Sequence, residues 1–350
     1  MALYTKSVKI GNIEIGGKSD VIIQSMTNSD TRDVYATVNQ IRQLQEAGCE
    51  LVRVSVLDEA AANAIKDIKK QIKIPLVADI HFDHRLAILS MENGVDKLRI
   101  NPGNIGSEEK IKLVVDCAKD KGIPIRIGVN GGSLEKHILE KYKHVTADAL
   151  CESALYHVAL LEKFGFNDIV ISLKASNVKI MYQAYNKISS LVKYPLHLGV
   201  TEAGSFFQGT VKSSIGIGAL LLNGIGDTIR VSLTEDPVEE IKVAKQILKV
   251  TEIRNEGVEI ISCPTCGRTQ IDLINLAKKV EKEFGYIKKP MKIAVMGCVV
   301  NGPGEAREAD IGVAGGNGVG LIFKKGEIIK KVNEDEIIAA LREIIEEDLS

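Results

Sequence analysis

The 350-residue chain contains no tryptophan, and aromatic residues make up only 4% of it. Its 45 lysines and arginines are balanced by 46 aspartates and glutamates, which leaves a formal net charge of −1. A protein that binds nucleic acid without sequence preference needs a basic excess, and binding of single strands usually adds aromatic side chains that stack on the bases. The composition therefore argues against a nucleic-acid-binding protein.

The sequence also lacks long hydrophobic runs. None approaches the roughly 20 apolar residues that a membrane-spanning helix needs, and the N-terminal segment has no signal-peptide hydrophobic core. We therefore expect a cytoplasmic protein with no membrane partner. Hydrophobic residues at 45% and charged residues at 26% are ordinary for a globular protein and exclude disorder as its main state.

Cysteine is scarce as well. Six cysteines are too few and too scattered for a disulfide scaffold in a chain of this length. Cys49, Cys117 and Cys151 are solitary, and we interpret them as small buried apolar residues. The other three crowd into the last quarter of the chain beside glycine and proline, where they look like ligands: Cys263, Cys266 and Cys298.

One pattern recurs through the first 250 residues, a short apolar strand followed by a turn and an amphipathic helix. Strands are expected at 20–25, 50–56, 75–80, 95–100, 124–129, 168–174, 195–200 and 227–233. Helices are expected at 34–47, 59–70, 107–121, 146–164, 177–192, 213–223 and 236–250. Apolar strands that alternate with helices indicate a parallel sheet covered on its outer face, and about eight such units indicate a (β/α)₈ TIM-type barrel. A doubly wound sheet is the rival, but no Gly-x-Gly-x-x-Gly follows the first strand.

Two further regions complete the predicted fold. An alternating stretch at 8–17 predicts a β-hairpin that precedes the barrel. We assign residues 1–255 to the barrel domain and residues 256–350 to a small α+β domain. In the second domain, strands are expected at 258–262, 291–296, 311–314, 319–324 and 327–332, and helices at 270–283 and 334–347.

Cationic side chains stand near the ends of most barrel strands, where the active sites of such barrels lie. Asp79 and Glu202 are the only obvious carboxylates there. One buried arginine usually belongs to a structural ion pair, but five cations exceed the nearby negative charge. The excess predicts a small anionic ligand, with more than one phosphate, bound by Arg53, Arg99, Arg126, Lys174 and Arg230. Other polar residues at the same strand ends are Asn130, His197, Thr201 and Ser232.

Two glycine-containing segments could add backbone N–H donors to this site. Residues 103–106 and 213–218 lie where helices are expected to begin, and helix N-termini are common phosphate sites. Glycine in a barrel loop is more often a turn residue, so this is the weaker part of the hypothesis.

The cysteines of the second domain predict a metal site. Cys263-Pro-Thr-Cys266 follows one expected strand, and Cys298 follows another. Zinc would need a fourth Cys or His, and all six histidines lie in the barrel. The nearest further donor is Glu305. Three thiolates and one carboxylate suit a catalytic [4Fe–4S] cluster, in which the iron bound by oxygen can exchange that ligand for substrate.

These motifs resemble a known family. CPTCGR at 263–268 and GCVVNGPGEAREADIG at 297–312, with VRVSV, ADIHF, KLRINPGN and PIRIGVNGGSL in the barrel, resemble the GcpE (IspG) family of 4-hydroxy-3-methylbut-2-enyl diphosphate synthases in its two-domain bacterial form. The resemblance runs from about residue 5 to residue 345. It implies an oxidoreductase that converts 2-C-methyl-D-erythritol 2,4-cyclodiphosphate to 4-hydroxy-3-methylbut-2-enyl diphosphate by a two-electron, ring-opening reductive dehydration in the methylerythritol phosphate route to isoprenoids.

Carried over by position, the resemblance also implies roles for single residues. Glu202 corresponds to a proposed proton donor, and Asn301 and Arg307 flank the exchangeable ligand. The implied cluster ligands are Cys263, Cys266, Cys298 and Glu305. The implied contacts of the cyclodiphosphate are Arg53, Arg99, Arg126, Asn130, Lys174, His197, Thr201, Arg230, Ser232 and Asn301. The resemblance further implies flavodoxin or ferredoxin as electron donor, and a homodimer in which the cluster domain of one subunit caps the barrel of the other.

Two alternatives remain open. A phosphate-binding barrel transferase of pterin or phosphosugar type, with a zinc-stapled tail, would explain the cations but neither Glu305 nor the missing fourth Cys or His. A zinc ribbon that contacts RNA would explain C-P-x-C-G, but the balanced charge and the absence of a second C-x-x-C argue against it. The iron, zinc and sulfide content of the protein separates these hypotheses.

Overall fold

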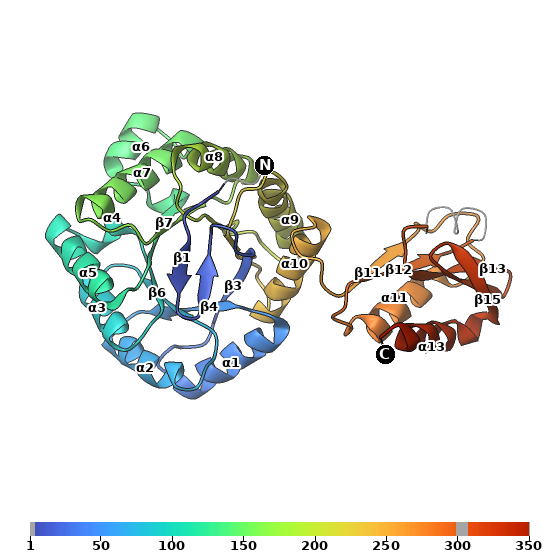
Figure 1. The fold of residues 1–350 in the computed structure, drawn as a ribbon. Helices are drawn as coiled ribbons and strands as arrows, with labels where there is room; N and C mark the ends of the chain where they lie inside the picture. The colour runs from blue at the N-terminus through green and yellow to red at the C-terminus, as the bar shows by residue number, and fades with distance from the viewer. Residues whose placement is uncertain (1–3, 299–306, 350) are drawn as a thin grey trace. The chain divides into compact units, whose positions relative to one another are not determined.

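The computed structural model describes residues 4–298 and 307–349. The chain divides into two compact units, Met1–Arg254 and Asn255–Ser350. Figure 1 shows helices surrounding the strands in the first unit, whereas the second has a sheet with helices beside it. None of the helices in the described ranges combines the length and the hydropathy that crossing a bilayer requires.

Within the described residues, eight parallel strands form the sheet of the first unit, in the order β8-β7-β6-β5-β4-β3-β10-β9. Their bounds are β3 (Ile22–Met26), β4 (Leu51–Val56), β5 (Leu76–Ile80), β6 (Lys97–Ile100), β7 (Ile125–Asn130), β8 (Ile169–Lys174), β9 (His197–Leu198) and β10 (Thr228–Ile229). A parallel bridge between Ile171 and Leu196 joins β8 to the segment before β9 and closes the barrel. The predicted TIM-type fold class is confirmed, although β9 and β10 are shorter than expected.

Helices surround this barrel (Figure 1). They are α1 (Val34–Ala47), α2 (Glu59–Lys69), α3 (His84–Glu92), α4 (Pro102–Ile105), α5 (Glu108–Lys121), α6 (Lys136–Tyr142), α7 (Ala147–Lys163), α8 (Val178–Leu191), α9 (Phe206–Leu222) and α10 (Pro237–Val250), with a 3₁₀ turn, η1 (Gly131–Ser133). Several begin at a side chain that accepts a first-turn N–H, such as Asp33 before α1 and Asp58 before α2.

Helix α9 corrects one prediction. It begins at Phe206 rather than at residue 213, so residues 213–218 lie inside the helix and do not form an N-terminal phosphate site. Two glycines of α9 allow close packing instead. A β-carbon at Gly209 would lie 2.5 Å from Leu233 Cδ2, and one at Gly216 would lie 2.9 Å from Val200 Cγ2. Helices α3, α4 and α6 are further differences, because the sequence analysis did not predict them.

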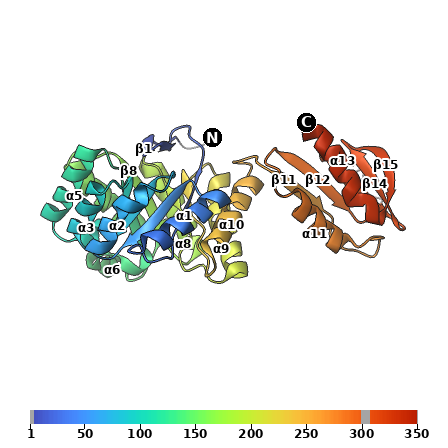
Figure 2. The same cartoon turned by 90° about the horizontal axis from the view of Figure 1, so that it is seen from below.

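The predicted hairpin closes one end of the barrel. Strands β1 (Val8–Ile10) and β2 (Ile13–Ile15) pair antiparallel around Gly11, whose φ of 55° suits glycine. Its buried apolar side chains pack on residues in the first halves of four barrel strands: Ile22, Leu51, Val77 and Val170. Figure 1 shows β1 within the outline of the ring, and Figure 2 shows it at one end of the barrel. We call this apolar layer the floor.

The second unit is a five-stranded mixed sheet in the order β11-β12-β13-β14-β15. Its elements are β11 (Val258–Ser262), α11 (Leu273–Phe284), β12 (Met291–Met296), β13 (Ile311–Gly316), β14 (Val319–Lys324), β15 (Glu327–Asn333), the 3₁₀ turn η2 (Glu334–Glu336) and α13 (Ile337–Leu349). Helices α11 and α13 share an apolar core with the sheet (Figure 2). Strands β11, β12 and β13 run parallel, so their carboxyl ends lie at one edge.

Candidate active site

The interior of the barrel is lined with charged side chains, where such barrels usually carry bulky apolar ones. Strand alternation explains how they get there. On β6, Leu98 and Ile100 join the apolar core shared with the helices, so Lys97 and Arg99 point inward. The sequence analysis predicted Arg99 as a site residue but missed Lys97, which occupies the first position of the same strand.

The predicted cations of β4, β6, β7 and β8 are all buried. Arg53, Arg99, Arg126 and Lys174 are each at most 7% exposed, and Arg126 is completely buried. Arg99 is paired in register with Asp79 on one side and with Arg126 on the other, so these side chains are inward-facing neighbours. The structure therefore brings together charges that lie far apart in the sequence.

Two carboxylates pair with these cations. Asp79 Oδ1 accepts a hydrogen bond from Arg99 Nη1 at 2.9 Å, and Asp79 Oδ2 lies 3.4 Å from Arg53 Nε. Burial opposes ionisation of Asp79, but Arg53 and Arg99 hold its pKa well below the usual range. The second carboxylate, Glu240 on α10, lies 3.8 Å from Arg230 Nη2, and the sequence analysis missed it.

The balance of charge is strongly positive. Six cations (Arg53, Lys97, Arg99, Arg126, Lys174 and Arg230) against the two carboxylates that pair with them leave an excess of four. Burial, and then repulsion by neighbouring arginines, lowers the pKa values of Arg126, Lys174 and Lys97. Burial likewise lowers the pKa of Arg53 to about 9. Buried charges of one sign are costly, and an anionic ligand would supply the missing counter-charge.

Unpartnered hydrogen-bond donors point to the same kind of ligand. Within the described part of the chain, no hydrogen bond reaches Nε, Nη1 or Nη2 of Arg126, Nζ of Lys97 or Nε of Arg230. Buried polar groups are almost always paired in folded proteins. A ligand with many acceptor oxygens, such as a diphosphate, would satisfy these donors.

The predicted polar residues surround the cations. His197 is fully buried on β9, with Nδ1 2.8 Å from Thr228 Oγ1 and Nε2 without a partner among the described residues. Burial and nearby cations lower its pKa, so the imidazole is neutral near pH 7. Asn130 ends β7, and Thr201 and Ser232 lie on the loops after β9 and β10. All three are partly exposed.

Glu202 adopts a strained backbone conformation. It is an exposed residue in the loop between β9 and α9, and its φ of 51° lies in the left-handed region. A non-glycine residue rarely adopts this conformation, and strain of this kind clusters at functional sites. Nothing in the residues around Glu202 predicts this conformation.

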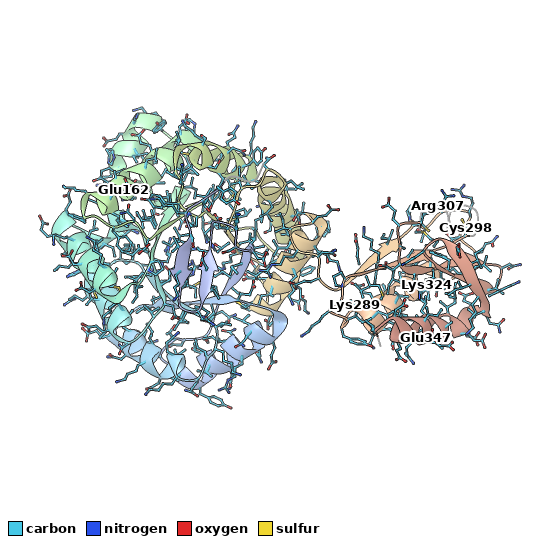
Figure 3. All side chains as sticks on the ribbon, viewed as in Figure 1. Glu162, Lys289, Cys298, Arg307, Lys324 and Glu347 are labelled. Carbon is cyan, nitrogen blue, oxygen red and sulfur yellow. The ribbon has the colours of Figure 1, made fainter. Side chains whose placement is uncertain are left out.

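The three predicted cysteine ligands belong to two neighbouring strand ends of the second unit. Cys263 follows β11 and Cys298 lies shortly after β12, and Ser262 pairs in register with Val295. Cys266 is exposed on the turn that follows Cys263. Figure 3 shows Cys298 at the same end of this unit as Arg307.

These cysteines have the chemistry of metal ligands. The Gly297 N–H donates to Cys263 Sγ at 3.2 Å, and backbone and side-chain hydrogen bonds to Arg268 lower the pKa of Cys266. The lowered pKa of Cys266 favours its thiolate, which is the form that binds metal. In contrast, burial raises the pKa of Cys49 to about 12 and that of Cys151 to about 11. Buried, inert thiols are what the sequence analysis expected at these two positions.

The ligand set itself is incomplete in the described residues. Among residues 4–298 and 307–349, no three His, Cys, Asp or Glu side chains are grouped closely enough to hold a metal ion. Glu305 and Asn301 lie outside the described residues. The thiols at one sheet edge still fit a cluster that binds thiolates.

Comparisons with known proteins cover both units. A family model described as the GcpE TIM-barrel domain matches residues 5–245, and one described as the GcpE protein C-terminal domain matches residues 259–347. A relative from Fusobacterium nucleatum is 68% identical over 349 residues, covering 100% of this chain and 99% of its own. One from Clostridium perfringens is 65% identical over 342 residues, covering 98% of each chain. Both are named 4-hydroxy-3-methylbut-2-en-1-yl diphosphate synthase (flavodoxin).

Solved structures with low sequence identity share the barrel. Dihydropteroate synthase from Stenotrophomonas maltophilia aligns with a TM-score of 0.52 and 12% identity, covering 71% of this chain and 100% of that chain. 3-Dehydroquinate dehydratase from Geobacillus kaustophilus aligns with a TM-score of 0.50 and 16% identity, covering 71% and 99%. At such identities the likeness concerns the fold alone.

Proposed function

The chain belongs to the GcpE family, and from this premise we propose that it catalyses the reaction of a 4-hydroxy-3-methylbut-2-en-1-yl diphosphate synthase. The substrate is 2-C-methyl-D-erythritol 2,4-cyclodiphosphate. Two electrons and two protons enter, the bond between one ring carbon and a phosphate oxygen breaks, and a hydroxyl group leaves as water. The observation that carries this proposal is the excess of buried, unpartnered cationic donors inside the barrel.

The arginines and Lys174 bind the diphosphate. The unpartnered guanidinium of Arg126 donates to its oxygens, while Asp79 holds the guanidinium groups of Arg53 and Arg99 in place. Negative charge develops on the phosphate oxygen as the ring opens. Fixed cations in a buried site stabilise that charge without reorganising, which lowers the barrier.

Polar residues around the cations orient the substrate and supply a proton. Glu202 donates the proton that converts the departing hydroxyl to water. Its exposed loop position leaves the carboxyl group free for this role. The neutral His197 donates a hydrogen bond rather than a charge. The remaining substrate contacts in this proposal are Asn130, Thr201, Arg230 and Ser232.

The second unit holds a [4Fe–4S] cluster in this proposal. Cys263, Cys266 and Cys298 bind it through thiolates, Glu305 supplies the exchangeable oxygen ligand, and Asn301 binds the substrate. When bound, the cluster supplies electrons to the substrate one at a time. The hydrogen bond from the Gly297 N–H to Cys263 Sγ and the lowered pKa of Cys266 support the assignment of these cysteines as thiolate ligands.

The proposal extends to partners and organisation. Flavodoxin, which is part of the names of both relatives, is the proposed electron donor, with ferredoxin as the alternative. Residues 1–255 form the substrate domain and residues 256–350 the cluster domain, and in a homodimer the cluster domain of one subunit caps the barrel of the other. A cytoplasmic location, where thiols stay reduced, suits the six free cysteines.

Metal analysis and an activity assay test this function. The protein is purified without oxygen, and iron, zinc and acid-labile sulfide are measured per chain. About four iron and four sulfide per chain, with consumption of the cyclodiphosphate by reduced flavodoxin, are expected. About one zinc and no sulfide would contradict the proposal and favour the zinc-stapled transferase.

A further inference from the structure

We propose that Lys97 is a further substrate-binding residue, which holds a phosphate group from the floor side of the barrel together with Arg126 and His197. The inference rests on the proposed function for the identity of the ligand, a diphosphate. Neither the sequence motifs nor the resemblance singled out Lys97.

The position of Lys97 places it deep in the barrel. On β6 it comes two residues before Arg99, on the same inward face. In register it pairs with Val77, and Val77 packs against the hairpin that forms the floor. Lys97 therefore lies at the level of the floor, whereas Arg99 lies nearer the open end.

Lys97 has no counter-charge of its own. Its side chain is completely buried, and Nζ makes no hydrogen bond with any described residue. The charges that act on it most strongly are those of Arg126 and Arg53, both of the same sign. The nearest interior carboxylate on its neighbouring strand, Asp79, is already engaged by Arg53 and Arg99. A buried lysine close to other cations destabilises the folded protein unless a ligand brings negative charge.

Other strands of the barrel also carry buried polar groups without partners among the described residues. Nε2 of His197 on β9, both amide atoms of Gln24 on β3 and all three guanidinium nitrogens of Arg126 on β7 have no partner within the described residues. Each of these residues is at most 1% exposed. Together with Lys97 on β6, these groups come from four different strands of the barrel. A phosphate group, with several acceptor oxygens and a negative charge, matches this set.

Substitution of Lys97 by methionine tests the assignment, because methionine keeps the length of the side chain and removes its charge. Two quantities are measured on the full chain: the melting temperature with and without inorganic pyrophosphate, and the Kd of the cyclodiphosphate by calorimetry. The matched control is Lys73→Met, which removes an exposed lysine. Lys97→Gln is a second variant that keeps the test decisive if Lys97→Met fails to fold.

We expect Lys97→Met to change the melting temperature differently with and without pyrophosphate. Without pyrophosphate, Lys97→Met melts at or above the wild-type temperature, because an unpaired buried cation is gone. With pyrophosphate, the wild-type protein gains more than the variant does. The cyclodiphosphate binds the variant about 10- to 100-fold more weakly, the usual loss for a charge-assisted hydrogen bond. Lys73→Met behaves as wild type in both measurements.

Two outcomes would overturn the inference. One is an unchanged Kd for the cyclodiphosphate in Lys97→Met while Arg126→Met weakens binding; the proposed function then stands and only the role of Lys97 fails. The other is a variant that is destabilised equally with and without pyrophosphate, which indicates a structural role. If Arg126→Met also binds normally, the proposed diphosphate site itself is wrong.

Discussion

The guanidinium of Arg99 lies directly against Gly128. A β-carbon at position 128 would be 2.4 Å from Arg99 Nε and 2.9 Å from Nη2, distances that real contacts do not reach. Arg99 also donates to the Gly128 carbonyl at 3.4 Å and to Asp79 at 2.9 Å. Because Gly128 has no side chain, the guanidinium group of Arg99 can occupy this position.

Gly128→Ala should displace that charge. We expect the Arg99 side chain to move, its bond to Asp79 to weaken and substrate affinity to fall about tenfold, with about 1 to 3 kcal/mol of stability lost to overpacking. Calorimetric titration with the cyclodiphosphate and urea unfolding measure the two effects. Gly132→Ala is the control, because a β-carbon there meets no atom within 4 Å. Normal affinity in Gly128→Ala would show that the position of Arg99 is not critical.

Asp79→Asn should destabilise the protein in a pH-dependent way. It leaves Arg53 and Arg99 without their shared carboxylate, and loss of one member of a buried pair costs about 3 to 5 kcal/mol. The folded-state pKa of Asp79 lies below its ordinary value of about 3.9. Its stabilisation is therefore complete above about pH 5 and is lost as the pH falls below about 4. Urea unfolding of both proteins at pH 7, 5 and 3.5 should show a constant difference and then a smaller one. A difference that grows in acid would contradict this account.

Two substitutions of Glu202 should separate its proposed role in catalysis from the strain of its backbone. Glu202→Gln keeps the shape of the side chain and removes the proton, so we expect turnover to fall about 100-fold or more while stability is unchanged. Glu202→Gly relieves the strain at φ 51° and should raise stability by about 0.5 to 1 kcal/mol, again without activity. The control is Glu252→Gly, at an exposed glutamate with a φ of 56°, which should gain stability and keep full activity. An active Glu202→Gln enzyme would refute the proton-donor role.

Cys263→Ser should remove iron from the protein. A serine hydroxyl does not replace the thiolate that receives the Gly297 N–H, so the variant should lose most of its iron, its sulfide and its brown absorbance. Cys117→Ser, at a half-buried solitary cysteine of the barrel unit, is the control and should keep them. Equal iron in the two variants would mean that Cys263 is not a cluster ligand.

Much of the fold could be predicted from the sequence, because apolar β-branched runs mark buried strands regardless of their surroundings. Arg53, Arg99 and Arg126 stood out for the same reason, as charges within or at the ends of such runs. Where tertiary packing decides, prediction failed. The glycines of residues 213–218 suggested a phosphate-binding helix N-terminus, but Gly216 lies inside α9, where a β-carbon would be 2.9 Å from Val200 Cγ2.

The depth of a side chain in the barrel could not be predicted either. Lys97 and Arg99 are two residues apart in the segment KLRI, and the surrounding sequence does not show which of them lies nearer the floor. Their depth in the barrel depends on the register of β6 with β5, in which Lys97 pairs with Val77. The left-handed backbone of Glu202 and the hydrogen bond from Gly297 to Cys263 also arise only in the folded chain. The role of Glu305 stays a prediction, because it lies outside the described residues.

The hairpin of β1 and β2 has a kinetic consequence. Its buried apolar residues pack on the amino-terminal halves of four barrel strands, so a ligand of the proposed diphosphate site is expected to enter and leave at the carboxyl ends of the strands. If product and substrate share the proposed diphosphate site, they exclude one another, and the product is expected to inhibit competitively against the cyclodiphosphate.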